Sequence, residues 1–146
     1  MPVSVEVDPT ISGISIATAD SILNYIIELE GFSVDEISIV FGNDDLLSKL
    51  KKDFFNKDQL TDVIAFRLNE YKEKKVEGEI YISIPRAKEN AETFGEPFAR
   101  EVGRLIIHGG LHLLNYDDQT EAEKNIMTHK EEEYLHQCNW QDLIHG

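Results

Sequence analysis

Four short segments of the chain have the residue pattern of β-strands. The first alternates apolar and polar residues, as a half-buried strand does. The other three are rich in β-branched and aromatic residues, which favour strands. The predicted strands are Val3–Val7, Glu36–Phe41, Thr61–Leu68 and Glu79–Ile84. The polar segment YKEKKVEGE joins the last two, and Pro85 is expected to end the run of strands.

Apolar residues at helical spacing, together with capping residues, predict five helices. These are Thr18–Leu29, a helix from Asn43-Asp44-Asp45 to about Phe55, Ala87–Phe94, Pro97–Leu114 and Thr120–His136. The fourth is apolar around much of its surface, as a helix buried in the core is. The fifth is highly charged, so we expect it on the surface, with the run 131–133 as a solvated face. The order of elements predicts an α+β fold, with helices packed on a mixed sheet of about four strands.

Size and composition are typical of one folded domain, expected to span residues 1–146. The 146 residues are 41% hydrophobic and 29% charged, and no apolar run is long enough to cross a membrane. The first residues, MPVSVEVDPT, lack the basic start and apolar run of a signal peptide. A lone Cys138 cannot close an internal disulfide, which fits a reducing compartment. We therefore expect a cytoplasmic protein.

The charge balance argues against tight binding to nucleic acid. There are 14 Lys and Arg residues against 28 Asp and Glu, a formal net charge of −14. Neutralisation of phosphates by basic side chains supplies most of the affinity of a sequence-independent nucleic-acid binder. A local group of arginines beside a metal can still bind phosphate within an acidic protein. The net charge therefore argues against a nucleic-acid-binding function without excluding it.

The most chemically informative stretch is the end of the fourth predicted helix. His108 and His112 lie four residues apart, on one face and about 6 Å apart along the axis, so both can reach one divalent cation. The alternative is two core histidines with one hydrogen bond each. Burial of two imidazoles costs several kcal/mol unless something compensates, which favours a metal. Gly109 and Gly110 each weaken the helix by roughly 1 kcal/mol relative to Ala, which indicates that something approaches it closely.

A third metal ligand is expected from the turn that follows. Asn115 falls where a helix C-cap adopts the left-handed conformation, which Asn tolerates. Such a cap reverses the chain and would bring Asp118, or alternatively Asp117, back to the histidine pair. Two histidines and an aspartate suit zinc or another divalent metal. A zinc peptidase is disfavoured, because the residue after the first histidine is Gly109 rather than the glutamate that serves as general base.

Three ordered motifs resemble the YbeY family of metal-dependent endoribonucleases, also called rRNA maturation factors. The segment HGGLHLLNYDD at 108–118 resembles the family signature HGxLHLxGYDH. The segments TDVIAF at 61–66 and GEIYIS at 78–83 are similar to the family strands TDVLSF and GDIxIS. The resemblance extends from about Phe55 to Glu132, which is over half of the chain.

The resemblance implies a single-strand-specific, zinc-dependent endoribonuclease. It implies action in maturation of the 3′ end of small-subunit ribosomal RNA and in ribosome quality control, with no DNA or membrane partner. A ribosomal protein or a ribosome-assembly GTPase is the expected protein partner. His108 and His112 fall on the first two ligand positions, whereas Asp118 stands where the family has a third histidine and Asn115 replaces a glycine. An aspartate is a harder donor, so another divalent metal could replace zinc.

The phosphate-binding cation of the family is missing from its usual place. Many relatives carry an arginine shortly before the TDV strand, but residues 54–58 contain none. The role could fall to Lys57, Arg67, Arg86 or Arg104. Arg104 lies one turn before His108 on the same helix face, although it could equally be a surface cation paired with a nearby glutamate. Arg67 ends a strand and could line the same cleft, so Arg104 and Arg67 are the predicted catalytic cations.

Two functions of different classes follow from these observations. The first is a metal-dependent endoribonuclease, in which the metal on the two histidines and Asp118 activates water for attack on a phosphodiester. The second is a metal-containing ribosome-assembly factor with little catalysis of its own. The net charge of −14 and the missing arginine favour this second function, because an acidic protein can dock on a basic ribosomal protein.

Overall fold

The structure, a computed structural model, describes residues 3–55 and 61–145, so the candidate cation Lys57 lies outside the described residues. It has an α+β fold, as the sequence predicts. The elements are β1 (Val3–Val7), α1 (Ile16–Leu29), β2 (Ser33–Gly42), α2 (Asp44–Phe55), β3 (Val63–Arg67), β4 (Lys75–Ser83), α3 (Ile84–Phe94), α4 (Phe98–Leu113), α5 (Glu121–Gln137) and a short 3-10 helix, η1 (Trp140–Leu143).

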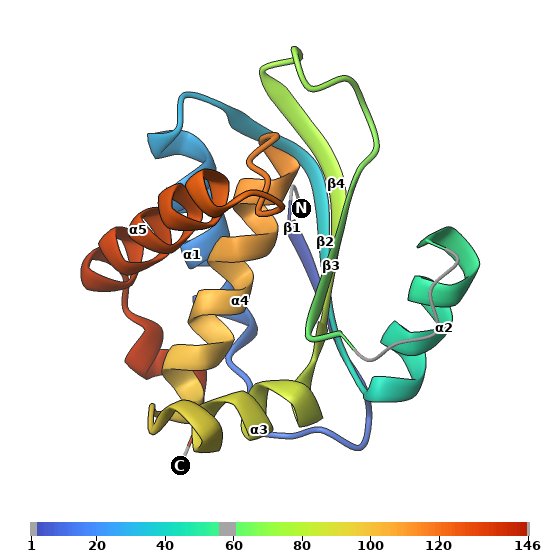
Figure 1. Cartoon of the computed structure of the whole chain (residues 1–146). Coiled ribbons are helices and arrows are strands. Elements are labelled where there is room, and N and C mark those ends of the chain that lie inside the picture. Colours follow the sequence, from blue (N-terminus) through green and yellow to red (C-terminus); the bar gives the residue numbers. More distant parts are fainter. Residues whose placement is uncertain (1–2, 56–60, 146) are drawn as a thin grey trace.

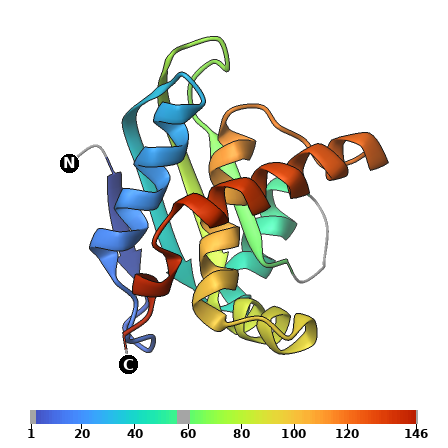
Figure 2. The ribbon, with the colours of Figure 1, turned by 90° about the vertical axis from the view of Figure 1, so that its left-hand side faces the viewer.

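The sheet has four strands in the order β1-β2-β4-β3 and is mixed. Strands β1, β2 and β4 run parallel to one another, and the edge strand β3 runs antiparallel to β4. Helices α1 and α4 cover one face, and α2 lies on the other (Figure 1). Helix α5 crosses α1 and α4 on their outer side (Figure 2). The edge strand β3 therefore stands between α4 on one side and α2 on the other. Among the described helices, none has the length and apolarity needed to cross a membrane.

Helix α4 lies at the centre of the hydrophobic core, as its apolar surface predicts. Its Leu105, Ile106 and Leu111 are fully buried. The two glycines of this helix allow close packing. A Cβ at position 109 would lie 2.7 Å from Cγ2 of Ile80 on β4, and one at 110 would lie 3.0 Å from a methyl of α1. The close approach inferred from these glycines is therefore explained by the sheet and by α1, and it does not require a ligand.

Helix α3 begins three residues earlier than predicted. Ser83 caps its N-terminus by accepting a hydrogen bond from the backbone N–H of Arg86. Pro85 occupies the first turn, where a missing N–H breaks no helical hydrogen bond. Strand β4 likewise begins at Lys75 rather than Glu79, because the charged residues at its start pair with β2. Backbone pairing across the sheet overrides the polar character of this segment.

The expectation that α5 is a surface helix with a solvated run at 131–133 is wrong for Glu131. Its exposure is only 5%, whereas its neighbours Glu132 and Glu133 are exposed. Met127 and Leu135 are buried on the same side of the helix. The carboxylate of Glu131 is tolerated there because it is paired, as described below.

Candidate metal centre and the surrounding cleft

Helix α4 ends in a turn that folds the chain back on the helix. Asn115 has a φ of 75°, in the left-handed region expected for it. The N–H of Asn115 donates to the carbonyl of His112 at 3.0 Å, and the N–H of Tyr116 donates to that of Leu111 at 3.1 Å. These two bonds make up the Schellman pattern of a helix C-terminus. The turn returns Asp118 to the histidine pair, which confirms the prediction from sequence.

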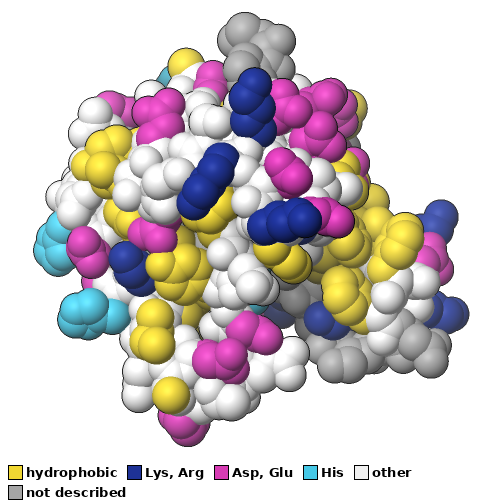
Figure 3. Space-filling view, turned by 90° about the horizontal axis from the view of Figure 1, so that it is seen from above, with side chains coloured by type: hydrophobic (Ala, Val, Ile, Leu, Met, Phe, Trp, Pro, Cys, Tyr) yellow, Lys and Arg dark blue, Asp and Glu magenta, His cyan; other side chains and the backbone are white. Residues whose placement is uncertain are grey.

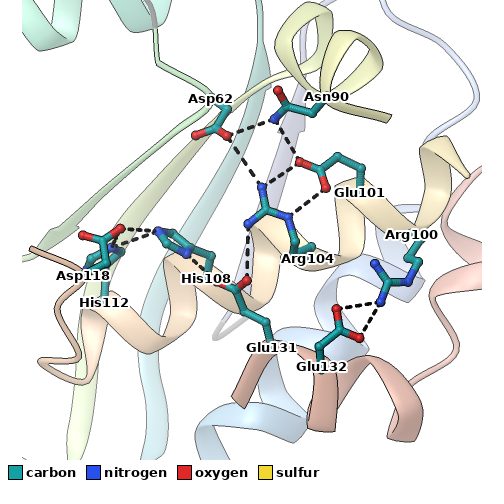
Figure 4. A network of polar contacts seen from close by, with 10 residues as sticks. All are labelled: Asp62, Asn90, Arg100, Glu101, Arg104, His108, His112, Asp118, Glu131 and Glu132. Atoms are coloured by element: carbon teal, nitrogen blue, oxygen red, sulfur yellow. Dashed lines mark hydrogen bonds and ion pairs between the residues drawn. The ribbon is translucent and has the colours of Figure 1, made fainter. Parts of the chain in front are cut away.

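Three possible ligand atoms converge at this turn (Figure 4). The Nε2 atoms of His108 and His112 are 3.0 Å apart, and Oδ2 of Asp118 lies 3.5 and 3.8 Å from them. Ligand atoms bound tetrahedrally to zinc at 2.0–2.1 Å lie roughly 3.3 Å from one another. The arrangement therefore fits a divalent ion. Of the two aspartates that the sequence leaves open, Asp118 belongs to this group and Asp117 does not.

Glu131 supports the first histidine from the opposite side of the ring. Its Oε2 lies 2.5 Å from Nδ1 of His108. A ring held in this way carries its proton on Nδ1 and presents Nε2, with its lone pair, to the metal position. Burial lowers the pKa of His112, which favours the neutral imidazole that binds metal. The chain thus holds both rings in a form suited to coordination.

Arg104 is surrounded by three carboxylates. Its guanidinium donates to both oxygens of Glu101 at 2.8 and 2.7 Å and to Oε1 of Glu131 at 3.3 Å. Asp62 lies 3.7 Å away, and Asn90 bridges Asp62 and Glu101. Burial alone would lower the pKa of Arg104, but its hydrogen bonds to Glu101 and the carboxylate charges raise it above the usual value.

The charge of this region favours a bound cation over an anion. The three carboxylates outnumber the single guanidinium, and Asp118 adds another carboxylate beside the histidines. Glu101 and Glu131 are only 2% and 5% exposed, so water screens their charge poorly. A divalent ion at the histidine pair would offset this excess negative charge.

A cleft of about 320 Å³ opens at the metal centre along the edge strand β3. It is lined by Lys51, Phe55, Thr61, Asp62, Val63, Ile64, Ala65, His108, His112, Asp117, Asp118 and Gln119. These residues come from the end of α2, from β3, from α4 and from the turn after α4. The centre therefore faces a space that a substrate can enter, with α2 as its opposite wall.

Among the described residues that line this cleft, neither Arg104 nor Arg67 appears. Arg104 pairs with Glu101, the alternative that the sequence leaves open. Arg67 donates to the carbonyl of Leu113 at the end of α4 and to acceptors in the β3–β4 loop. Arg86 pairs with Asp44. The predicted catalytic roles of Arg104 and Arg67 stay predictions.

The peptidase alternative lacks a position for its base. The residue after the first histidine, Gly109, faces Ile80 of the sheet rather than the cleft. A longer side chain at this position would collide with the core.

Sequence reasoning missed Glu131, although a signal for it exists. Met127, Glu131 and Leu135 are spaced by four residues, which puts the glutamate on the apolar stripe of α5. A carboxylate on such a stripe indicates a buried partner. Nothing local indicates that the partners are His108 and Arg104, because they lie on another helix.

The α+β fold brings two histidines and an aspartate together at a cleft, which is the ligand set of a candidate metal site that a substrate can reach. A family model described as "Endoribonuclease YbeY" matches residues 10–139. The protein of that name from a Geobacillus species is 42% identical over 127 residues, which cover 80% of this chain and 81% of the relative. The one from Desulforamulus reducens is 39% identical over 124 residues, with 80% and 81% covered. The chain therefore belongs to the YbeY endoribonuclease family.

A solved structure supports the same relationship. The solution structure of TM1509 from Thermotoga maritima aligns with a TM-score of 0.63 and 27% sequence identity. The alignment covers 91% of this chain and 86% of that one. The likeness extends well beyond the three motifs that carry the resemblance in sequence.

Proposed function

We propose that this protein is a cytoplasmic, metal-dependent endoribonuclease that cleaves single-stranded RNA during maturation of the 3′ end of small-subunit ribosomal RNA. Membership of the YbeY family supports an RNA substrate. The observation that carries the proposal is the convergence of His108, His112 and Asp118 at the floor of an open cleft. A ribosomal protein or a ribosome-assembly GTPase would deliver the protein to its substrate.

His108, His112 and Asp118 would hold the metal, and the two imidazole nitrogens favour zinc. Asp118 is a harder donor than a third histidine, so manganese or another divalent ion competes more effectively. A metal bound there supplies Lewis-acid activation of water and stabilises the charge that develops on the phosphoryl oxygens. Glu131 keeps the ring of His108 oriented, and Arg104 keeps Glu131 in place.

Cleavage of an unstructured RNA that contains the 3′ end of precursor small-subunit ribosomal RNA tests the proposal. We expect cleavage by the metal-loaded protein and its loss, by at least about 100-fold, in Asp118→Ala, because one of three ligands is removed. His129→Ala is the matched control, since His129 is an exposed histidine on α5 outside the ligand group. Equal cleavage by the native protein and Asp118→Ala would contradict the proposal.

The acidic character of the chain favours a second candidate, a ribosome-assembly factor with little catalysis of its own. With a net charge of −14, the protein is suited to dock on a basic ribosomal protein. This alternative predicts that Asp118→Ala still binds a ribosomal protein, while the native protein leaves RNA intact. Cleavage by the native protein decides against it.

A further inference from the structure

We propose that a cluster of three phenylalanines, which reaches the cleft through Phe55, forms a binding site for nucleobases beside the metal centre. These are Phe54 and Phe55 at the end of α2 and Phe66 on β3, which we call the aromatic wall. Its ligand would be an unpaired base of single-stranded RNA, stacked on an exposed ring. The inference rests on the proposed function, since it assigns the means by which the substrate is held.

The rings of the aromatic wall are packed on one another. The Phe66 ring lies 5.8 Å from that of Phe55 at an angle of 17° and 5.3 Å from that of Phe54 at an angle of 64°. Tyr81 on β4 supports Phe66 from the sheet, with ring centroids 6.0 Å apart. A half-buried ring therefore fixes two outer rings, which leaves a rigid surface for stacking.

The two outer rings leave much of their surface exposed beside each other. Phe54 is 67% exposed and Phe55 is 43% exposed. Two adjacent phenylalanines at a helix end therefore leave a joint apolar surface in contact with water. In the view from above, hydrophobic side chains gather on the side of the molecule where α2 lies, next to Lys or Arg side chains (Figure 3).

The aromatic wall reaches the cleft of the metal centre through one of its rings, Phe55. Phe55 and Lys51 line the same cleft as His108 and Asp118. A base stacked on Phe55 would therefore be part of a strand whose backbone passes the metal. Lys51 extends over the Phe55 ring, with Nζ 4.8 Å from the ring centroid. A base that stacks on this face would displace the ammonium group, which could then pair with the adjoining phosphate.

Stacking resolves the conflict between the acidic charge and an RNA substrate. A chain of net charge −14 gains little from a general attraction to phosphates. Stacking on an aromatic ring depends little on charge and accepts every base, because each has a π face. Duplex bases are already paired and stacked, so the aromatic wall also selects single strands.

Binding of a fluorescein-labelled oligoadenylate, measured by anisotropy in the presence of EDTA, tests the inference without cleavage. We expect Phe54→Ala and Phe55→Ala each to weaken binding about 5- to 150-fold, which corresponds to 1–3 kcal/mol per stacked base. Phe55→Leu, which keeps an apolar side chain without a π face, should also bind the oligoadenylate more weakly than the native chain. Phe55→Trp should bind at least as tightly as the native chain.

Phe94→Ala is the control, since Phe94 is 63% exposed at the end of α3 and does not line the cleft. Its affinity for the oligoadenylate should match that of the native protein. Lys51→Ala should make the dependence of log K on log salt shallower by about 0.7, the value for one phosphate contact on a single strand. Because Phe54 and Phe55 are exposed, their variants should keep the native metal content and the native temperature of thermal unfolding.

Unchanged binding in both phenylalanine variants, or equal loss in Phe94→Ala, would overturn the inference. A native protein that binds no oligoadenylate would also overturn it. So would phenylalanine variants that bind oligoadenylate normally and lose only their binding to a ribosomal protein. These failures differ from failure of the proposed function. If the native chain binds RNA through the aromatic wall but does not cleave it with metal, only the nuclease assignment falls. If it cleaves RNA but the phenylalanine variants bind and cleave equally well, only the aromatic wall falls.

Discussion

The contact between Glu131 and His108 predicts that a residue that does not itself bind the metal controls metal affinity. Glu131 contacts Nδ1 of His108 at 2.5 Å and Arg104 at 3.3 Å, and it is 5% exposed. Glu131→Ala removes both contacts and leaves the ring of His108 free to rotate. Loss of a partner that orients a metal-binding histidine weakens metal binding about 10- to 100-fold.

The same substitution has a separate effect on stability. A hydrogen bond to a charged group contributes about 1.5–3 kcal/mol, and the longer contact contributes less. Arg104 keeps its bonds to Glu101, so it is not left unpaired. We therefore expect the free energy of unfolding of the metal-free protein to fall by about 3 kcal/mol in Glu131→Ala. Glu131→Gln keeps an acceptor for His108 and should lose less than tenfold in zinc affinity.

Competition with a chromophoric zinc chelator measures the affinity, and urea unfolding measures the stability. Glu132→Ala is the matched control, because Glu132 is the exposed neighbour and its pair with Arg100 lies on the surface. It should change the free energy of unfolding by less than about 1 kcal/mol and leave zinc affinity intact. Native zinc affinity in folded Glu131→Ala would refute the reasoning.

Three further predictions concern stability. Burial alone raises the pKa of Glu30, but hydrogen bonds from two tyrosines and a lysine outweigh it and lower the pKa below 4.5. The stability that the ionised Glu30 contributes is thus present above pH 4.5 and is lost as the pH falls through the folded pKa. Glu30→Gln should therefore lower the free energy of unfolding in urea by about 2 kcal/mol at pH 7 and by less in acid. Gly109→Ala should cost about 1–2 kcal/mol because the new methyl meets the stiff side chain of Ile80, whereas Gly110→Ala should be nearly neutral in the same assay. Arg67→Lys should lower the free energy of unfolding by about 2 kcal/mol, and a large loss of RNA cleavage in a stable variant would instead support its catalytic role.

The parts of the centre that depend on neighbours in sequence were predictable. His108 and His112 share a helix face, and the left-handed cap at Asn115 decides where Asp118 lies. Each step spans only a few residues, so helix geometry and capping chemistry suffice to bring the three candidate ligands together. The α+β class followed from the order of the elements for the same reason.

The features that join distant segments were not predictable from one sequence. The partner of Glu131 lies on another helix, and the early start of β4 depends on pairing with β2. Likewise, Phe54 and Phe66 belong to elements whose contact only the fold establishes. The two glycines of α4 were interpreted as space for a ligand because the sequence does not show that Ile80 fills it.

The metal content of protein purified without an affinity tag or chelator tests the central claim most directly. Elemental analysis should find about one divalent ion per chain in the native protein and in His129→Ala, and almost none in Asp118→Ala. A native chain that takes up no metal, even after zinc is offered, would contradict the account. Retention of a full equivalent of metal by Asp118→Ala would contradict the assignment of the third ligand.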